Sequence, residues 1–210
     1  MPTDPPCAIT RPGPFRFLAL GDSYTIGESV AESERWPVQL ADQLRAGGVN
    51  IQPPEIIART GWTTSELNRA IDEVDPHGPY DLVSLLIGVN NQYRGYPQEN
   101  YRAEFAVLLD RAVGFAGSDP RKVLVLSIPD WGMTPFGERD GRDTISAEID
   151  AFNAINRQIS KERGVRYIDI TPISRLSIDG LVANDDLHPS GKQYGMWVDL
   201  TLPEACAALQ

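Results

Sequence analysis

The sequence predicts an α/β fold in which a mostly parallel, five-stranded sheet is covered by helices on both faces. Two observations carry this prediction: short, nearly continuous apolar runs, and longer segments whose apolar residues recur at helical spacing. The two kinds of segment alternate along the chain, which is typical of parallel strands joined by right-handed crossovers. The runs at residues 81–87 (DLVSLLI) and 122–128 (KVLVLSI) have the composition of strands that are buried on both faces.

Five segments are expected as strands because each is a short apolar run between turn-forming residues. In chain order they are Phe15–Leu20, Glu55–Ala58, Asp81–Ile87, Lys122–Ile128 and Val165–Ile170. The helices between and after them are expected at Glu34–Ala46, Thr63–Val74, Pro97–Ala116, Ala147–Arg163 and from Ser190 to about Leu200 or on towards Leu209. Thr63 or Thr64 is the expected N-cap of the second helix, and Gly164 is expected to end the fourth.

Composition places limits on the domain organisation and on the partners. Residues 1–14 contain five prolines and are expected to form an extended arm, whereas residues 15–210 are expected to form a single domain. A chain of 210 residues, 41% of them hydrophobic, needs no metal or disulfide to build a core. The net charge of −10 disfavours nucleic acid and anionic membranes as partners, because phosphate groups would be repelled.

The two cysteines, Cys7 and Cys206, lie near opposite ends of the chain. A disulfide between them is geometrically possible because the termini of a domain often lie close together. Two separate thiols are the interpretation that we favour. We find no signal peptide and no apolar run of 18 residues, so a cytoplasmic location without membrane insertion is expected. The sequence leaves the oligomeric state open.

The loops that follow the expected strands carry the candidate functional residues, because ligands of parallel sheets bind at the carboxyl edge. In the first loop, Ser23 stands where backbone N–H groups and a helical turn would stabilise negative charge; alternatively, Asp22 and Ser23 only cap a helix. Gly61 in the second loop and Asn90 in the third supply a backbone and a side-chain donor. Taken alone, both are more typical of ordinary turns than of a functional site.

The chain has only two histidines, so the choice of a general base is between two residues. His77 lies in a turn before the third strand, at the amino edge of the sheet, whereas His188 follows the fifth strand. Asp185, three residues before His188, can bring its carboxylate to Nδ1 and leave Nε2 free to accept a proton. The alternative is that this segment only begins a helix. A nucleophile, a base with its orienting carboxylate and two donors at one edge together indicate acyl transfer.

These residues resemble the conserved blocks of the SGNH (GDSL-type) hydrolases. The matching segments are Gly21-Asp22-Ser23, Gly61, Gly88-Val89-Asn90 and Asp185-Asp186-Leu187-His188. They occur in the family's order and span residues 21–188, and Tyr24 stands where the family usually has leucine. The resemblance implies a flavodoxin-like three-layer α/β/α sandwich, the SGNH hydrolase fold.

The resemblance also implies an activity, namely hydrolysis of carboxylic esters through an acyl-enzyme. It makes Ser23 the nucleophile, His188 the base and Asp185 its orienting residue. The oxyanion hole would consist of the Ser23 and Gly61 backbone N–H groups and the Asn90 side chain. No cofactor and no metal are expected. A zinc site is disfavoured because the chain has two histidines and no cysteine pair at metal-binding spacing.

The expected substrate is a small-molecule ester with a short acyl chain, such as an acetyl ester of a small alcohol or sugar, because no residues remain for a lid. Asn91, Tyr93 and Trp131 are candidate substrate-binding residues, although Trp131 and Phe136 are equally typical of core residues. A lysophospholipase or thioesterase-type lipolytic hydrolase and a catalytically inactive flavodoxin-like binding module remain alternatives. A phosphate-binding module is disfavoured because no loop has a glycine-rich run or a lysine.

Overall fold

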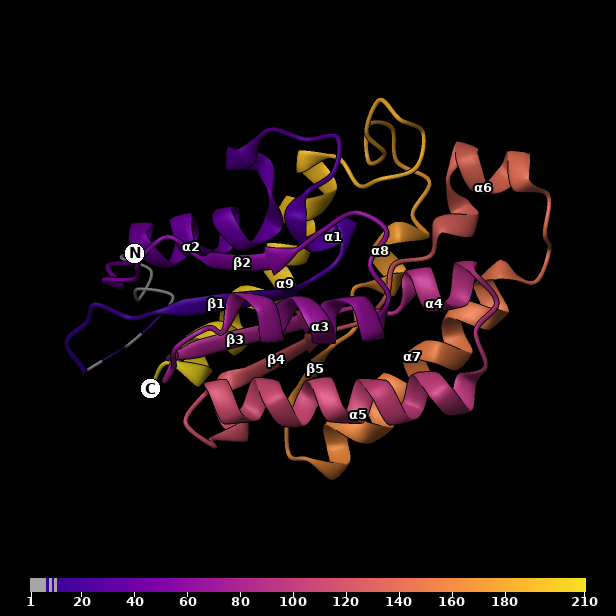
Figure 1. The fold of residues 1–210 in the computed structure, drawn as a ribbon. Coiled ribbons are helices and arrows are strands. Elements are labelled where there is room, and N and C mark those ends of the chain that lie inside the picture. Colours follow the sequence, from indigo (N-terminus) through magenta and orange to yellow (C-terminus); the bar gives the residue numbers. More distant parts are fainter. Residues whose placement is uncertain (1–6, 8, 10) are drawn as a thin grey trace.

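The computed structural model describes residues 7, 9 and 11–210. Five strands are present: β1 (Phe17–Gly21), β2 (Glu55–Ala58), β3 (Leu82–Leu86), β4 (Val123–Leu126) and β5 (Arg166–Ile168). They form one sheet in the order β2-β1-β3-β4-β5, and every neighbouring pair is parallel (Figure 1). This is the flavodoxin-like strand order.

Five long helices form two layers, one on each face of the sheet (Figure 1). On one face, α2 (Trp36–Ala46) packs against α9 (Gly191–Ala208). On the other face, α5 (Gln98–Phe115) packs between α3 (Thr64–Val74) and α7 (Ile145–Glu162). The predicted α/β/α sandwich with a five-stranded parallel sheet is therefore confirmed.

The shorter elements lie mostly in the loops. They are the helices α1 (Ser23–Ile26), α4 (Val89–Tyr93), α6 (Pro135–Asp140) and α8 (Thr171–Ser174), and the 3-10 turns η1 (Glu32–Glu34), η2 (Pro120–Lys122) and η3 (Trp131–Met133). The sequence predicted a helical turn only after the first strand, because a helix of four to six residues is too short to show a period. The four short helices all follow carboxyl ends of strands, so they shape the edge where the candidate residues lie.

The core confirms which strands are central. Every residue of β1, β3 and β4 is buried, whereas the edge strands β2 and β5 are partly exposed. Thr63 is the N-cap of α3, and its hydroxyl accepts a hydrogen bond from the backbone N–H of Glu66. The last helix continues through Pro203 to Ala208, which settles its end. Among the described helices, none has the length and apolar character that crossing a bilayer requires.

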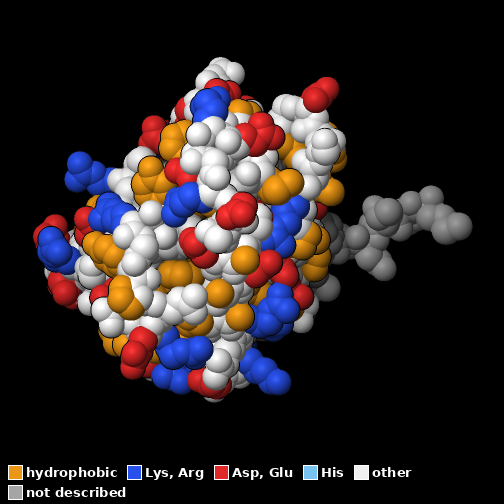
Figure 2. Space-filling view, turned by 90° about the vertical axis from the view of Figure 1, so that its right-hand side faces the viewer, with side chains coloured by type: hydrophobic (Ala, Val, Ile, Leu, Met, Phe, Trp, Pro, Cys, Tyr) orange, Lys and Arg blue, Asp and Glu red, His pale blue; other side chains and the backbone are white. Residues whose placement is uncertain are grey.

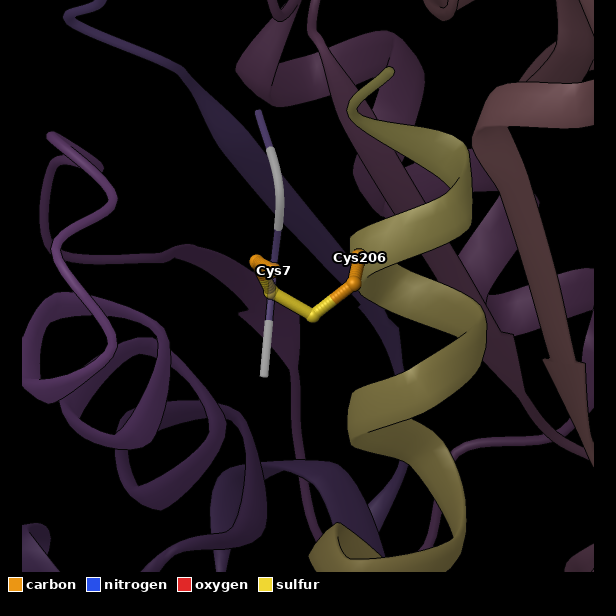
Figure 3. Close-up of a disulfide and its surroundings, with 2 residues drawn as sticks. All are labelled: Cys7 and Cys206. Atoms are coloured by element: carbon orange, nitrogen blue, oxygen red, sulfur yellow. A yellow bond between two sulfur atoms is a disulfide. The ribbon is translucent and has the colours of Figure 1, made fainter. Parts of the chain in front are cut away.

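Cys7 and Cys206 form a disulfide, with their Cα atoms 5.1 Å apart (Figure 3). The preference for two separate thiols was therefore wrong. The helix α9 ends against η2, at the amino edge of the sheet, and Arg11 of the arm pairs with Asp81 at the same edge. Both cysteines are thus brought to one place by elements far apart in the sequence. Structural disulfides are rare in reducing compartments, so the bond does not favour the expected cytoplasmic location.

The predicted arm, residues 1–14, is described only in part, because residues 1–6, 8 and 10 lie outside the described residues. What the structure shows of it is its attachment. Cys7 is buried beside α9, and the backbone of Phe15 exchanges hydrogen bonds with the segment before β2, at Asn50 and Gln52. The disulfide therefore ties the start of the chain to the last helix.

We expect Cys7→Ser to lower the melting temperature, because the disulfide closes a loop of nearly the whole chain and restricts the unfolded state. The expected loss in the free energy of unfolding is about 2–4 kcal/mol, which corresponds to a decrease of about 5–15 °C in Tm. Thermal unfolding of wild type and variant, each with and without reductant, measures it. Reductant should leave the variant unchanged; a wild-type Tm that is insensitive to reductant and equal to that of the variant would contradict the prediction.

Candidate active site

Ser23 lies just beyond the end of β1, at the first position of α1. The preceding residue, Asp22, caps this helix, and its Oδ1 accepts a hydrogen bond of 3.1 Å from the backbone N–H of Tyr24. The Ser23 carbonyl accepts hydrogen bonds from the N–H groups of Gly27 and Glu28. The hydroxyl is thus carried by a tight turn at the carboxyl edge of the sheet, where α1 begins.

His188 and Asp185 lie together in the turn that precedes α9. The Asp185 Oδ2 atom is 2.6 Å from Nδ1 of His188, and its Oδ1 atom accepts the backbone N–H groups of Leu187 (3.0 Å) and His188 (2.9 Å). The Ser29 hydroxyl also donates to Oδ2, at 2.6 Å. With Nδ1 facing the carboxylate, the proton-accepting position left to the imidazole is Nε2.

The surroundings of Asp185 keep its carboxylate ionised. Partial burial opposes the charged form, but the hydrogen bonds from Ser29, His188 and two backbone N–H groups outweigh it and hold the pKa of Asp185 well below its ordinary value. The carboxylate is therefore negative at neutral pH and can stabilise a positive charge on the His188 ring.

The loop after β2 is held by residues of α4 and its C-cap. Gly61 has a φ of +87°, which favours glycine, and its carbonyl accepts a hydrogen bond of 2.6 Å from Nη2 of Arg94. The Asn90 side-chain amide donates to the carbonyl of Trp62 at 2.9 Å. These two contacts fix the carbonyl groups of Gly61 and Trp62, so the backbone at Gly61 and the Asn90 amide are held in place.

Ser23, Gly61, Asn90 and His188 line one cavity of about 200 Å³. The remaining lining residues are mostly apolar or aromatic: Tyr24, Thr60, Val89, Tyr93, Trp131, Phe136 and Leu187. Figure 2 views the molecule from the side to which the strands point, and both signs of charge are interspersed there with apolar side chains. The net negative charge is therefore not gathered into one acidic patch on this face.

Two of the three candidate substrate-binding residues, Tyr93 and Trp131, line this cavity, and Asn91 does not. Asn91 is buried, and its side chain pairs with Thr64, accepting from the backbone N–H (3.0 Å) and donating to the hydroxyl (2.8 Å). The structure thus corrects the expectation for Asn91, which anchors the start of α3. The reason is the helix α4, in which consecutive residues face different directions.

Trp131 is both a core residue and part of the cavity wall, because it is only 2% exposed and also lines the cavity. Its indole N–H donates to Oε1 of Gln92 (2.8 Å), and the Gln92 amide donates to Glu148 (2.7 Å). The ring of Phe136 lies 5.9 Å away, centroid to centroid. Trp131 is therefore a fixed wall of the cavity.

Sequence reasoning missed two residues that contact the site, Ser29 and Arg94. Ser29 bonds to Asp185, and Arg94 bonds to the carbonyl of Gly61 and to Glu66. Neither belongs to a motif with a recognisable spacing. Among the described residues, no group of three or more His, Cys, Asp or Glu side chains is placed to hold a metal ion.

Comparison with known proteins identifies the family. The model of the GDSL-like Lipase/Acylhydrolase family matches residues 19–196. The chain belongs to this family. It is thus a GDSL/SGNH-family hydrolase, as the resemblance of its sequence blocks implied, and ester hydrolysis is its general activity. No curated protein sequence is similar enough to count as a match.

Several solved structures share the fold. TesA is 18% identical, with 90% of this chain and 97% of that chain covered and a TM-score of 0.70. The psychrotrophic esterase EstA from Pseudoalteromonas sp. is 20% identical, with coverages of 89% and 93% and a TM-score of 0.67. The acetylxylan esterase Axe2 from Geobacillus stearothermophilus is 17% identical, with coverages of 92% and 95% and a TM-score of 0.70. At these identities the likeness concerns the fold.

Asp22, directly before Ser23, is a buried carboxyl group. Burial raises its pKa to about 7, against the opposing effect of the hydrogen bond from the Tyr24 N–H group. Its Oδ2 atom has no hydrogen-bond partner among the described residues. Between its ordinary pKa of 3.8 and about 7, the folded protein therefore binds a proton here that the unfolded chain does not.

We expect the stability contributed by a protonated Asp22 to be fully present below about pH 4 and to be lost as the pH rises through about 7. Going from pH 8 to pH 5 should raise the free energy of unfolding by about 2–3 kcal/mol through this group. Asp22→Asn should lack that gain, as urea unfolding at both pH values would measure. The control Asp42→Asn, at an exposed carboxylate, should behave like wild type. The same pH dependence in all three proteins would contradict the prediction.

Proposed function

We propose that the chain hydrolyses short-chain carboxylic esters, with Ser23 as the nucleophile, His188 as the general base and Asp185 as its orienting residue. One observation carries the proposal: Ser23 and His188 line the same cavity as Gly61 and Asn90, and the far side of the imidazole is bonded to Asp185. Family membership supplies the reaction class, acyl hydrolysis.

In the first step, the ester carbonyl enters the cavity above Ser23. Nε2 of His188 removes the proton from the Ser23 hydroxyl as Oγ bonds to the carbonyl carbon. The carbonyl oxygen becomes an oxyanion that accepts hydrogen bonds from the Ser23 N–H, the Gly61 N–H and the Asn90 amide. The ionised Asp185 stabilises the protonated imidazole.

In the second step, the tetrahedral intermediate collapses. His188 donates its proton to the leaving alcohol oxygen, the bond from carbon to that oxygen breaks, and the acyl group stays on Ser23. A water molecule then gives a proton to His188 as its oxygen attacks the acyl carbon. Breakdown of the second intermediate releases the carboxylic acid and restores the Ser23 hydroxyl.

The size and lining of the cavity support short acyl chains as the preferred substrates. Its volume of about 200 Å³ lies below the range of about 300–1,000 Å³ that is typical of pockets for drug-sized ligands. Trp131, Phe136 and Val89 offer an apolar wall to an uncharged acyl group. Acetyl esters of small alcohols or sugars fit these limits, and a protein of the same fold, Axe2, is an acetylxylan esterase.

Ser23→Ala is expected to lower the turnover of 4-nitrophenyl acetate by about 10⁴-fold or more, because the attacking oxygen is removed. A fluorophosphonate probe should label the wild type and not the variant, with circular dichroism showing an unchanged fold. Ser118→Ala is a suitable control, since Ser118 lies between α5 and η2, at the amino edge of the sheet. Wild-type labelling or turnover in Ser23→Ala would refute the proposed nucleophile.

Trp131→Leu is expected to shift the preference towards longer acyl chains, because it shortens the fixed wall of the cavity. The ratio of kcat/KM for octanoyl over acetyl 4-nitrophenyl esters should rise by about 10-fold or more, since each added methylene contributes on the order of 1–3 kcal/mol where it fits. Tyr96→Ala, at an exposed aromatic residue, serves as the control. A wild-type preference for chains of more than about eight carbons would contradict the proposed substrate class.

A further inference from the structure

We propose that Ser29 is a positioning residue of the catalytic centre, whose hydroxyl holds the Asp185–His188 pair in place against the segment that carries Ser23. The inference rests on the proposed function, because Ser29 acts through His188. Ser29 lies outside the sequence blocks of the family resemblance, and its role follows from its contacts alone.

One carboxylate oxygen of Asp185 is shared by Ser29 and His188. The Ser29 hydroxyl donates to Oδ2 of Asp185 at 2.6 Å, and the same oxygen lies 2.6 Å from Nδ1 of His188. The other oxygen, Oδ1, is bonded by the N–H groups of Leu187 and His188. Three of these four donors therefore belong to the turn of Asp185 itself, and Ser29 connects the carboxylate to a different part of the chain, 156 residues away.

A short path of backbone and hydrogen bonds leads from Ser29 back to the proposed nucleophile. The backbone N–H of Glu28 donates to the carbonyl of Ser23 at 3.0 Å, and Ser29 is the next residue. Two hydrogen bonds therefore link the backbone of the nucleophile to the carboxylate that orients the base. The Glu28 carboxylate also accepts a hydrogen bond from Thr60, which precedes Gly61. Residues 28 and 29 thus contact two of the other segments that line the cavity, the one with Gly61 and the one with His188.

Ser29 also has an unusual backbone conformation. Its φ is +65°, in the left-handed region that is unfavourable for residues other than glycine and asparagine. Ser29 is exposed, so packing of its side chain does not require this conformation. Strained residues of this kind cluster at functional sites, where neighbouring contacts hold them. The side-chain contact that the structure shows for Ser29 is its hydrogen bond to Asp185.

The hydroxyl has two physical effects on the catalytic pair. It fixes the position of Oδ2, and so restricts the orientation of the imidazole. It also withdraws negative charge from the oxygen that faces Nδ1. Without it, the two backbone donors still keep Asp185 ionised, but more charge remains on Oδ2 to stabilise a protonated imidazole. Removal of the hydroxyl should therefore slow turnover and raise the pH below which activity declines.

Other titratable groups surround the pair, and all of them remain in the Ser29 variants. The ring of Tyr24 packs against that of His188, at 5.8 Å between centroids. The groups near these rings and near Asp185 are Asp22, Glu28, Asp130, Tyr194 and Asp186, which pairs with Arg139. Because Asp22 has a pKa of about 7, its own titration can affect the pH profile of activity, so the His188 ring must be observed directly by NMR.

The test uses Ser29→Ala and Ser29→Gly in the full chain. We expect kcat for 4-nitrophenyl acetate to fall by about 10-fold in both, with KM within twofold of wild type. The acid limb of kcat/KM should move up by about half a pH unit. The NMR titration midpoint of the His188 ring should move in the same direction while that of His77, the second histidine of the chain, stays fixed.

The two substitutions separate the hydroxyl from the backbone. Glycine adopts a φ of +65° without strain, so wild-type behaviour of Ser29→Gly would assign the effect to the backbone and overturn the proposal. Ser118→Ala is the matched control, because Ser118 is also exposed and has a φ of +62° but lies far along the chain from the catalytic loops. It should leave kcat, KM and both histidine titrations unchanged.

An acid limb and a His188 midpoint that are unchanged or move down in both Ser29 variants would also overturn the proposal. Its failure is distinguishable from failure of the proposed function, which is read by fluorophosphonate labelling of Ser23 in the wild type. The NMR titration needs no turnover, so it decides whether Ser29 acts on His188 even if Ser23 is not labelled.

Discussion

The hydrogen-bonded register of β1 with its two neighbours sets the level at which the loops that line the cavity begin. Gly21, the last residue of β1, is paired with Ala58 of β2 and with Leu86 of β3. The chain therefore leaves three adjacent strands at one height. Within two to four residues each segment reaches the cavity with a hydroxyl group, a backbone N–H group or a side-chain amide. Because all neighbouring pairs are parallel, these groups meet at one edge without any long loop to carry them.

Hydrogen bonds made by side chains then fix the loops relative to one another. Arg94 holds the carbonyl of Gly61, Asn90 holds that of Trp62, and Ser29 holds the carboxylate of Asp185. Each contact joins segments that leave different strands or helices. The proposed donors and the proposed base are thus oriented before a substrate enters, which is the condition under which hydrogen bonds stabilise a transition state most effectively. The wall of the cavity is also fixed in advance, because Trp131 is hydrogen-bonded to Gln92, which in turn is hydrogen-bonded to Glu148.

The sequence predicted what depends on periodicity and chain order. The buried strands were predictable because continuous apolar runs identify them. The presence of His188 rather than His77 at the cavity was predictable because His77 lies at the amino edge. The orientation of Asn91 was not, since a helix of five residues shows no period and its neighbour Asn90 faces elsewhere. The disulfide between Cys7 and Cys206 depends on where the last helix ends in space. The sequence does not show this, because the two cysteines are 199 residues apart. Contacts of this kind arise from tertiary structure, so they leave no local pattern in the sequence.

Several unfavourable features of the molecule lie at the carboxyl edge. Asp22 is buried with a raised pKa and an oxygen that lacks a partner among the described residues. Ser29 has a left-handed backbone, and Gly88 has a φ of +131° and lies so close to Tyr101 that a Cβ atom would clash with its hydroxyl. Such features lower stability and persist where the surrounding structure enforces them. The disulfide lies at the opposite edge, where it can offset part of this loss without touching the cavity. The proposed catalytic groups and the disulfide thus lie at opposite edges of the sheet, so a substitution at one edge need not disturb the other.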